Sequence, residues 1–309
     1  MTGPRIALAT CRDAWRDDDD ATPTLDALTG AGADASAQVW DDASVDWSDF
    51  DLVVVRSTWD YVPRRAEFLD WADHVAAVST LANPADVIRW NTDKRYLADL
   101  AADDVPVVPT TFVLAADVSA DQGADAVAAA RDALPDRGEF VVKPTVSAGS
   151  RDTTRYGDGA TSVDAATAHV VTLLEAGRDV MVQPYLDAVD TVGETGLVHL
   201  GGRFSHAFRK GPLLQRGGGP VTGLYAREEI TPRTPSPPEL DLGRQVLDAV
   251  AARFDSPLLY ARVDVLADRD GAPVLLELEL TEPSFFLDTD PAAAARVAEA
   301  CLAAVTLSR

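Results

Sequence analysis

The chain has 309 residues, and its 27 basic against 50 acidic residues give a formal net charge of −23, which opposes binding to nucleic acid or anionic membranes. Hydrophobic residues make up 47%, as in ordinary folded proteins, but no apolar run is long enough to span a membrane. With two distant cysteines and no signal-peptide pattern, we expect a cytoplasmic protein without disulfides.

The N-terminal region has the element order of an open α/β sheet. We expect strands at residues 5–9, 35–40 and 49–56, and a helix that is capped by Thr22 and ends near Gly30. The third strand is a continuous apolar run, which is typical of a strand buried on both faces. The glycines of a dinucleotide-binding motif are missing after the first strand.

Polar and aromatic residues follow the third strand, at the carboxyl end where open α/β sheets bind ligands. Arg56 is a candidate anchor for a substrate carboxylate, because a guanidinium matches a carboxylate bidentately. Ser57, Thr58 and Asp60 would complete this substrate site. The alternative is that Ser57 or Asp60 caps the helix predicted over 63–78.

Lysine is scarce, so each of the three lysines in the chain needs a specific explanation. Lys94 is predicted in the first turn of a helix capped by Asn91, where the helix dipole disfavours a cation unless an anion is bound. Lys143 ends the strand 140–144 and precedes a hydroxyl-rich loop, 145–152, that could close over phosphates. The lysine of a P-loop follows its loop instead, so that motif is excluded.

A proline-rich stretch at 105–110 predicts a domain linker. Residues 211–238 contain glycine and proline clusters and predict a long mobile connection that covers an active site. The remaining expected elements are strands at 111–114, 180–186, 195–200 and 203–209 and helices near 121–134, 164–176, 239–254 and 291–302.

The acidic and apolar residues of 275–283 alternate with period two, and this segment forms a predicted hairpin with the strand 260–266. Asp264 would then lie beside Glu277 and Glu279 on one face. Three carboxylates repel one another unless a hard cation lies among them, and such oxygen ligands suit Mg²⁺ that also binds phosphates. The alternative is a solvated outer face of the hairpin.

The ordered set of these features resembles the ATP-grasp superfamily and, within it, the glutathione-synthetase-like branch, from about Asp51 to Pro283. The resemblance implies an α/β fold, α+β in parts. It would comprise an N-terminal open α/β domain at 1–104, a central lid subdomain at 105–186 and a C-terminal nucleotide- and metal-binding subdomain at 187–309. The motifs that carry the resemblance are Asn83-Pro84, Lys94, Val141-Val142-Lys143-Pro144, Val182-Gln183-Pro184-Tyr185-Leu186, Arg209-Lys210, Asp264 and Glu277-Leu278-Glu279.

The resemblance also implies ATP and Mg²⁺ as cofactors. Asp264, Glu277 and Glu279 would hold the metal, although the family usually has asparagine where Glu279 stands. Catalytic roles fall to Arg262 and to Lys210 or Arg209, with a structural ion pair as the alternative for Arg262. The residues implied to bind the nucleotide are Lys94, Lys143, Ser147, Ser150, Gln183, Tyr185, Leu186 and Glu194, the last one residue off the family's spacing.

The activity implied by the resemblance is an ADP-forming ligation of a carboxylate to an amine through an acyl phosphate. The substrates would be small and amino-acid-like, and the chain is similar to the cyclo-ligase that closes the cycloserine ring from O-ureido-serine, a step of antibiotic biosynthesis. An ATP-grasp kinase and a non-catalytic nucleotide-binding protein are the alternatives. The sequence leaves a homo-oligomer open.

Overall fold

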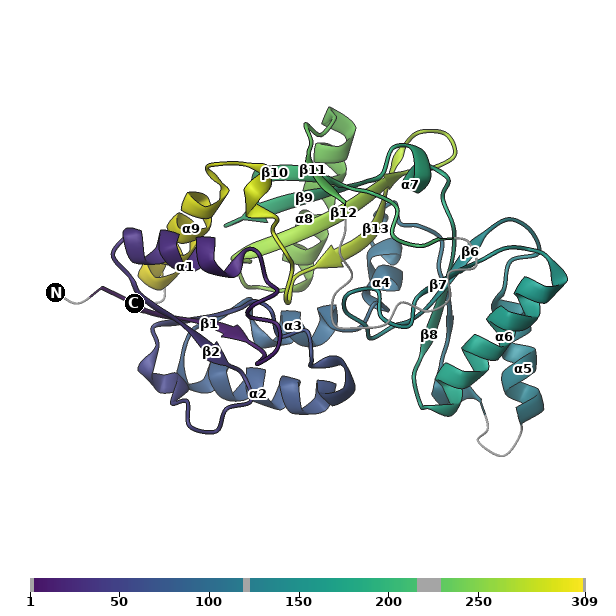
Figure 1. Ribbon diagram of the computed structural model, residues 1–309, viewed down its shortest axis with the longest axis horizontal. Helices are drawn as coiled ribbons and strands as arrows, with labels where there is room; N and C mark the ends of the chain where they lie inside the picture. Colours follow the sequence, from purple (N-terminus) through teal and green to yellow (C-terminus); the bar gives the residue numbers. More distant parts are fainter. Residues whose placement is uncertain (1–2, 119–122, 216–228, 308–309) are drawn as a thin grey trace.

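The computed structural model describes residues 3–118, 123–215 and 229–307, which form three sheets (Figure 1). In these ranges, no helix has both the length and the apolar character needed to cross a membrane. Residues 216–228 of the predicted connection at 211–238 lie outside the described residues. Within its described part, a short strand, β11 (Ile230–Pro232), pairs with β10 (Arg203–Lys210).

The first sheet is parallel, in the order β2-β1-β3-β4. Ile6 and Leu8 of β1 face one way and pack with helices α1 and α9, while Ala7 and Ala9 face the other way and pack with α2. Both faces are therefore covered, as an all-parallel sheet requires. The elements are β1 (Arg5–Thr10), α1 (Ala21–Gly30), β2 (Asp34–Val39), β3 (Leu52–Val55), α2 (Arg65–Val78), β4 (Leu81–Ala82) and α9 (Ala293–Leu307).

The helix at the carboxyl end of the described chain is thus part of the packing of the first sheet. Val297 and Cys301 of α9 lie in the same apolar cluster as Leu28 of α1. Figure 1 shows α1 and α9 side by side, near the place where the two ends of the chain lie. Helix α1 begins at Ala21, so Thr22 lies inside the helix and does not cap it, contrary to the prediction.

The second sheet forms a separate layer at the end of the molecule opposite the chain termini (Figure 1). Its strand order is β5-β8-β6-β7 and all its pairs are antiparallel. Helices α5 and α6 cover one face through a cluster that includes Val142, Val170 and Leu174. The elements are β5 (Thr111–Val113), α5 (Gly123–Ala133), β6 (Phe140–Pro144), β7 (Thr154–Tyr156), α6 (Ala160–Glu175) and β8 (Val180–Pro184). The short β7 was not predicted.

The third sheet is antiparallel, in the order β11-β10-β9-β12-β13. Leu197, Val263 and Leu278 cluster with Val246 of helix α8, which covers that face. The predicted acidic hairpin is present as β12 and β13. The remaining elements of this part are α7 (Ala188–Thr191), β9 (Glu194–Leu200), α8 (Pro237–Arg253), β12 (Tyr260–Ala267) and β13 (Pro273–Glu279).

Residues 83–110 connect the first sheet to the second and lie against the third. Asn91 ends α3 and does not cap the following helix. Its side chain donates to the Leu278 carbonyl at 2.8 Å and accepts from the Leu280 N–H at 2.7 Å. The predicted linker is likewise attached, because the Val108 N–H donates to the Leu275 carbonyl at 2.9 Å. The helices are α3 (Ala85–Asn91) and α4 (Tyr96–Ala102), and short 3-10 turns lie at Trp47–Asp49, Val62–Arg64, Ala115–Asp117 and Leu287–Thr289.

Candidate active site

A pocket lies where the three sheets meet, and all three lysines of the chain line it. Lys143 comes from the end of β6, Lys210 from the end of β10, and Lys94 from the connection between α3 and α4. The sequence predicted Lys94 inside a helix, but its position before α4 brings it to the pocket equally well. Three cations in one cavity of a strongly acidic protein indicate a polyanionic ligand.

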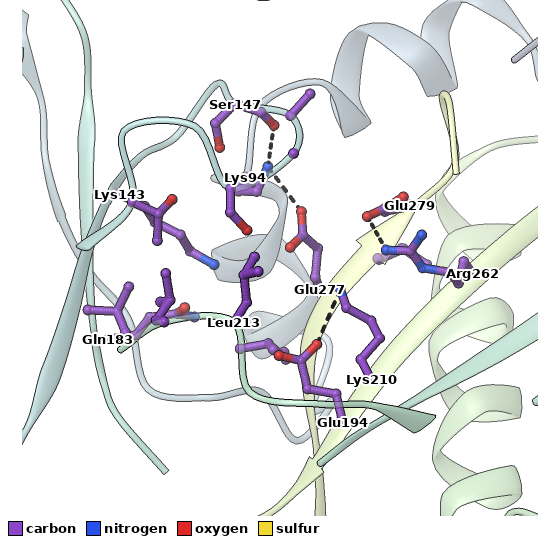
Figure 2. A pocket seen from close by; sticks show the side chains of 18 of the residues that line it. Lys94, Lys143, Ser147, Gln183, Glu194, Lys210, Leu213, Arg262, Glu277 and Glu279 are labelled. Atoms are coloured by element: carbon purple, nitrogen blue, oxygen red, sulfur yellow. Dashed lines mark hydrogen bonds and ion pairs between the residues drawn. The ribbon is translucent and has the colours of Figure 1, made fainter. Parts of the chain in front are cut away.

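Lys94 links the second and third sheets across the pocket (Figure 2). Its Nζ donates to the Ser147 carbonyl at 2.7 Å and lies 3.0 Å from Oε1 of Glu277. The pKa of Lys143 is lowered because the ammonium group is buried, although Glu277 opposes this effect. A bound anion would favour the charged form of Lys143, as expected of a phosphate-binding lysine.

The hydroxyl-rich loop after β6 faces the lysines. Ser147, Gly149 and Ser150 line the pocket, and both Gly149 and Ser150 have a φ of 58°. Residues in this left-handed region turn successive backbone N–H groups toward one side, which makes a concave site for anions. Ser147 and Ser150 therefore lie where the sequence predicted phosphate contacts.

The part of the pocket beside the second sheet is apolar. Tyr185 and Leu186 cluster with Leu266 and Leu276, and this cluster can accept a flat base. The Tyr185 hydroxyl donates to Asp190 at 2.6 Å, which fixes the ring. The Gln183 side chain donates to the Thr110 hydroxyl at 2.9 Å and also lines the pocket.

Glu194 and Lys210 lie together on the third sheet, with 3.4 Å between Oε2 and Nζ (Figure 2). Both line the pocket. Arg209, offered as an alternative to Lys210, points elsewhere because successive strand residues face opposite ways. Its Nε donates to the Val192 carbonyl at 2.8 Å, and Arg209 is not a lining residue among those described.

The acidic hairpin has the predicted register, in which Asp264 lies opposite Glu277 and Arg262 lies opposite Glu279. Glu277 and Glu279 line the pocket, whereas Asp264 is only 1% exposed and lies behind Arg262. Arg262 donates to Asp264 from Nε at 2.9 Å and from Nη2 at 2.8 Å, and it also pairs with Glu279 (Figure 2). The ion pair given as the alternative role for Arg262 is thus present.

The described residues contain no group of three acidic, histidine or cysteine side chains already arranged around a metal position. The donor chemistry nevertheless fits a hard divalent cation at Glu277 and Glu279. Burial, only partly offset by Arg262 and reinforced by Asp264 and Glu277, raises the pKa of Glu279 to about 8. A cation beside Glu279 would relieve this cost. Glu277 differs, because the three lysines outweigh burial and lower its pKa to about 2.

The end of the pocket beside the first sheet is built by residues that the sequence analysis did not assign. Trp59 and Tyr61 reach it from the segment after β3, and Glu282, Ser284 and Phe286 reach it from the segment after β13. Burial, partly offset by the Tyr61 hydroxyl, raises the pKa of Glu282 to about 7. The available signal was a third glutamate three positions beyond Glu279, followed by proline.

The structure corrects the predicted substrate anchor at Arg56. The side chain is 2% exposed and lies outside the pocket lining. Its Nη1 donates to the Pro283 carbonyl at 2.9 Å, its Nη2 is 3.4 Å from Asp20, and the guanidinium lies 4.1 Å from the Phe285 ring centroid. Arg56 therefore supports the segment after β13 from behind.

Ser57, Thr58 and Asp60 are also absent from the pocket lining among the described residues. The Ser57 hydroxyl lies 2.8 Å from that of Thr10, and Thr58 is fully buried. Asp60 accepts from Trp40 at 2.8 Å and from Arg64 at 2.6 Å. In this stretch the aromatic residues Trp59 and Tyr61 line the pocket, whereas the polar residues pack within the first sheet. The predicted substrate-binding residues therefore do not reach the pocket.

Comparison with known proteins gives concordant results. The sequence family described as "D-cycloserine synthetase DcsG, N-terminal domain" matches residues 6–83. Cycloserine biosynthesis protein DcsG of Streptomyces lavendulae is 40% identical over 300 residues, which cover 96% of this chain and 97% of that protein. The crystal structure of D-cycloserine synthetase DcsG has a TM-score of 0.88 and 39% identity, covering 97% of this chain and 99% of that one.

More distant structures share the fold alone. D-alanyl-alanine synthetase A from Vibrio cholerae has a TM-score of 0.66 at 13% identity and covers 100% of this chain and 99% of its own. The RimK domain ATP-grasp protein from Sphaerobacter thermophilus has a TM-score of 0.64 at 16% identity and covers 96% of this chain and 99% of its own. These likenesses confirm the predicted ATP-grasp fold.

Proposed function

Because the chain belongs to the D-cycloserine synthetase family of ATP-grasp ligases, we propose that it closes the cycloserine ring from O-ureido-serine with conversion of ATP to ADP. ATP phosphorylates the substrate carboxylate, and a nitrogen of the same molecule then attacks the carbonyl carbon. The C–N bond forms as the bond to phosphate breaks and the nitrogen loses a proton. Water then hydrolyses the carbamoyl group on that nitrogen, which leaves as carbon dioxide and ammonia, and the product is cycloserine. The observation that carries the proposal is one pocket whose lining combines the three lysines and a hydroxyl-rich loop with the apolar cluster around Tyr185 and with the glutamates of the acidic hairpin.

The position of each pocket residue indicates which part of ATP it would bind. Lys94, Lys143 and the loop at Ser147–Ser150 hold the phosphates, because they form the cationic and N–H-rich wall. Tyr185 and the cluster around it hold the base. These contacts contribute mainly position and charge, and positioning supplies much of the catalysis in phosphoryl transfer.

The acidic hairpin lies where the γ-phosphate and the substrate carboxylate would meet. Glu277 and Glu279 would hold Mg²⁺, which neutralises phosphate charge when bound. Arg262 lines the pocket and is held in place by Asp264, Glu279 and the Ser284 carbonyl, so its positive charge can stabilise the substrate carboxylate or the oxyanion that forms from it. Lys210, 3.8 Å from Asp264, adds a second cation at this point.

The test is a product analysis with the purified chain, Mg²⁺-ATP and O-ureido-serine. We expect ADP and free phosphate in equal amounts, together with cycloserine detected by mass spectrometry. A kinase would release ADP and a phosphorylated amino acid without free phosphate, and a non-catalytic binding protein would release no ADP. Lys143→Ala is the control for background ATPase, since it removes a cation from the phosphate wall.

A further inference from the structure

One carboxylate at the small end of the pocket has no role in the mechanism above. Glu282 follows the acidic hairpin and lines the pocket beside Trp59, Tyr61 and Phe286. The Trp59 indole donates to the Glu282 carbonyl at 3.4 Å, and the Tyr61 hydroxyl interacts with the Glu282 carboxyl. Glu282 is therefore held by Trp59 and Tyr61 on the pocket wall.

The backbone on both sides of Glu282 is fixed by long-range hydrogen bonds. The Tyr260 hydroxyl donates to the Thr281 carbonyl at 2.8 Å, and Arg56 donates to the Pro283 carbonyl at 2.9 Å. Asp20 accepts from the Phe285 N–H at 2.6 Å. A segment restrained in this way presents its side chain in one place, which is what recognition of a small ligand requires.

The charge of Glu282 lacks a direct counterpart in the described part of the chain. The charges of Lys94 and Arg262 lower the pKa of Glu282, but burial outweighs them. Burial without a cation disfavours the ionised form, in agreement with the raised pKa of this carboxyl. A ligand cation bound here would form a charge-assisted hydrogen bond with the carboxylate and a cation–π interaction with the neighbouring aromatic rings.

The proposed substrate supplies such a cation. An amino acid carries a carboxylate and an ammonium group on one carbon, and the pocket lining offers Arg262 and Glu282 as matching charges. We propose that Glu282 binds the α-ammonium group of the substrate, and so selects amino acids over simple carboxylic acids. The inference rests on the proposed ligase reaction. In that reaction the nitrogen that closes the ring is not the α-nitrogen, so the α-ammonium group is available to bind Glu282.

The experiment compares O-ureido-serine with its des-amino analogue, 3-(ureidooxy)propanoate, in the wild-type chain and in Glu282→Gln. We expect the wild type to prefer the amino acid, and Glu282→Gln to lower kcat/KM for it by about 10- to 100-fold, as for loss of a charged hydrogen bond. The value for the analogue should change by less than about twofold, and the Kd for Mg²⁺-ATP should stay the same. Glu299→Gln, on the exposed face of α9, is the matched control and should change neither.

Three results would overturn the inference. An equal loss of kcat/KM for both substrates in Glu282→Gln would show that Glu282 only supports the fold. A raised Mg²⁺ requirement or a loss of ATP binding would assign Glu282 to the nucleotide site. A wild-type chain that uses both substrates equally well would also contradict it. A wild-type chain that converts neither substrate refutes the proposed function instead, so the two failures are distinguishable.

Discussion

Substitution of Arg56 by alanine separates the role predicted from the sequence from the role shown by the structure. A substrate anchor could be removed with little effect on folding. In the structure, however, Arg56 is buried, pairs with Asp20 and supports Pro283 and Phe285 from behind the pocket. We therefore expect Arg56→Ala to act first on stability and only indirectly on catalysis.

The expected loss of unfolding free energy follows from the buried charge of Asp20 that Arg56→Ala leaves without its ion-pair partner. Removing one partner of a buried ion pair costs about 3–5 kcal/mol, because the other charge stays buried. Asp20 keeps three backbone donors, from Phe285, Phe286 and Leu287, at 2.6, 3.0 and 2.8 Å, which argues for the lower end of that range. Loss of the guanidinium contact with Phe285 adds about 0.5–2 kcal/mol, so we expect a loss of about 3–5 kcal/mol in all.

The loss should also depend on pH in a definite direction. Burial raises the pKa of Asp18, and the charge of Arg56 opposes that rise. A carboxyl whose folded pKa exceeds its unfolded value favours folding at low pH, and this contribution is lost as the pH rises through the folded pKa. Because Arg56→Ala raises the pKa of Asp18 further, its penalty should be smaller at about pH 5 than at about pH 8.

The assay is urea unfolding, combined with kinetics under conditions where the variant is folded. Arg64→Ala is the matched control, because Arg64 also pairs with aspartates and lies 4.7 Å from a tryptophan ring, but its side chain is 34% exposed. Its loss should cost only about 0.2–1 kcal/mol. The reasoning is refuted if Arg56→Ala unfolds within about 1 kcal/mol of the wild type but loses amino-acid binding by about 100-fold.

Four further substitutions test the phosphate-binding lysine, the acidic hairpin and the contact between the first and third sheets. Lys143→Ala should weaken Mg²⁺-ATP binding by about 2–4 kcal/mol in calorimetry, and an unchanged Kd would remove Lys143 from the phosphate site. Without nucleotide, Glu277→Gln should lower the urea midpoint, because its lysine partners lose their counter-charge. Glu279→Gln should raise the urea midpoint, because it removes a buried carboxyl with a raised pKa, and the rise should be larger at about pH 8 than at about pH 5. Both should abolish turnover, and midpoint shifts of the same sign would contradict this account. Asn83→Leu removes hydrogen bonds of 2.8, 2.9 and 2.8 Å to the backbone of Leu259, Tyr260 and Leu280. It should lower the free energy of unfolding by about 2–5 kcal/mol in thermal or urea unfolding. A loss below about 1 kcal/mol would show that water replaces the side chain.

The opposite shifts in the urea midpoint expected for Glu277→Gln and Glu279→Gln revise a simpler hypothesis that the sequence suggested. Three neighbouring acids on one face should repel one another, so removing any of them should stabilise the protein without ligand. The structure pairs Glu277 with Lys94 at 3.0 Å, and lysines from three distant segments act on it. Repulsion therefore dominates only at Glu279, where burial and the neighbouring acids outweigh Arg262.

The sequence by itself determined the features that depend on local pattern and on unusual composition. Alternation in 275–283 specified which face of the hairpin Glu277 and Glu279 occupy, since side chains alternate along any strand. The scarcity of lysine marked Lys94, Lys143 and Lys210 as functional candidates, and all three line the pocket. The ordered set of motifs was enough to identify the ATP-grasp fold.

Only the tertiary structure decided which charged residues face the pocket and which are used inside the fold. Arg56 and Pro283 are 227 positions apart, and no local pattern reports that the packing of the first sheet against the segment after β13 brings them together. The same packing turns Glu282 into the pocket beside Tyr61, while Asp264 is enclosed behind Arg262. Local sequence fixes the direction of a side chain relative to its own strand, but its partners are set by contacts between distant segments.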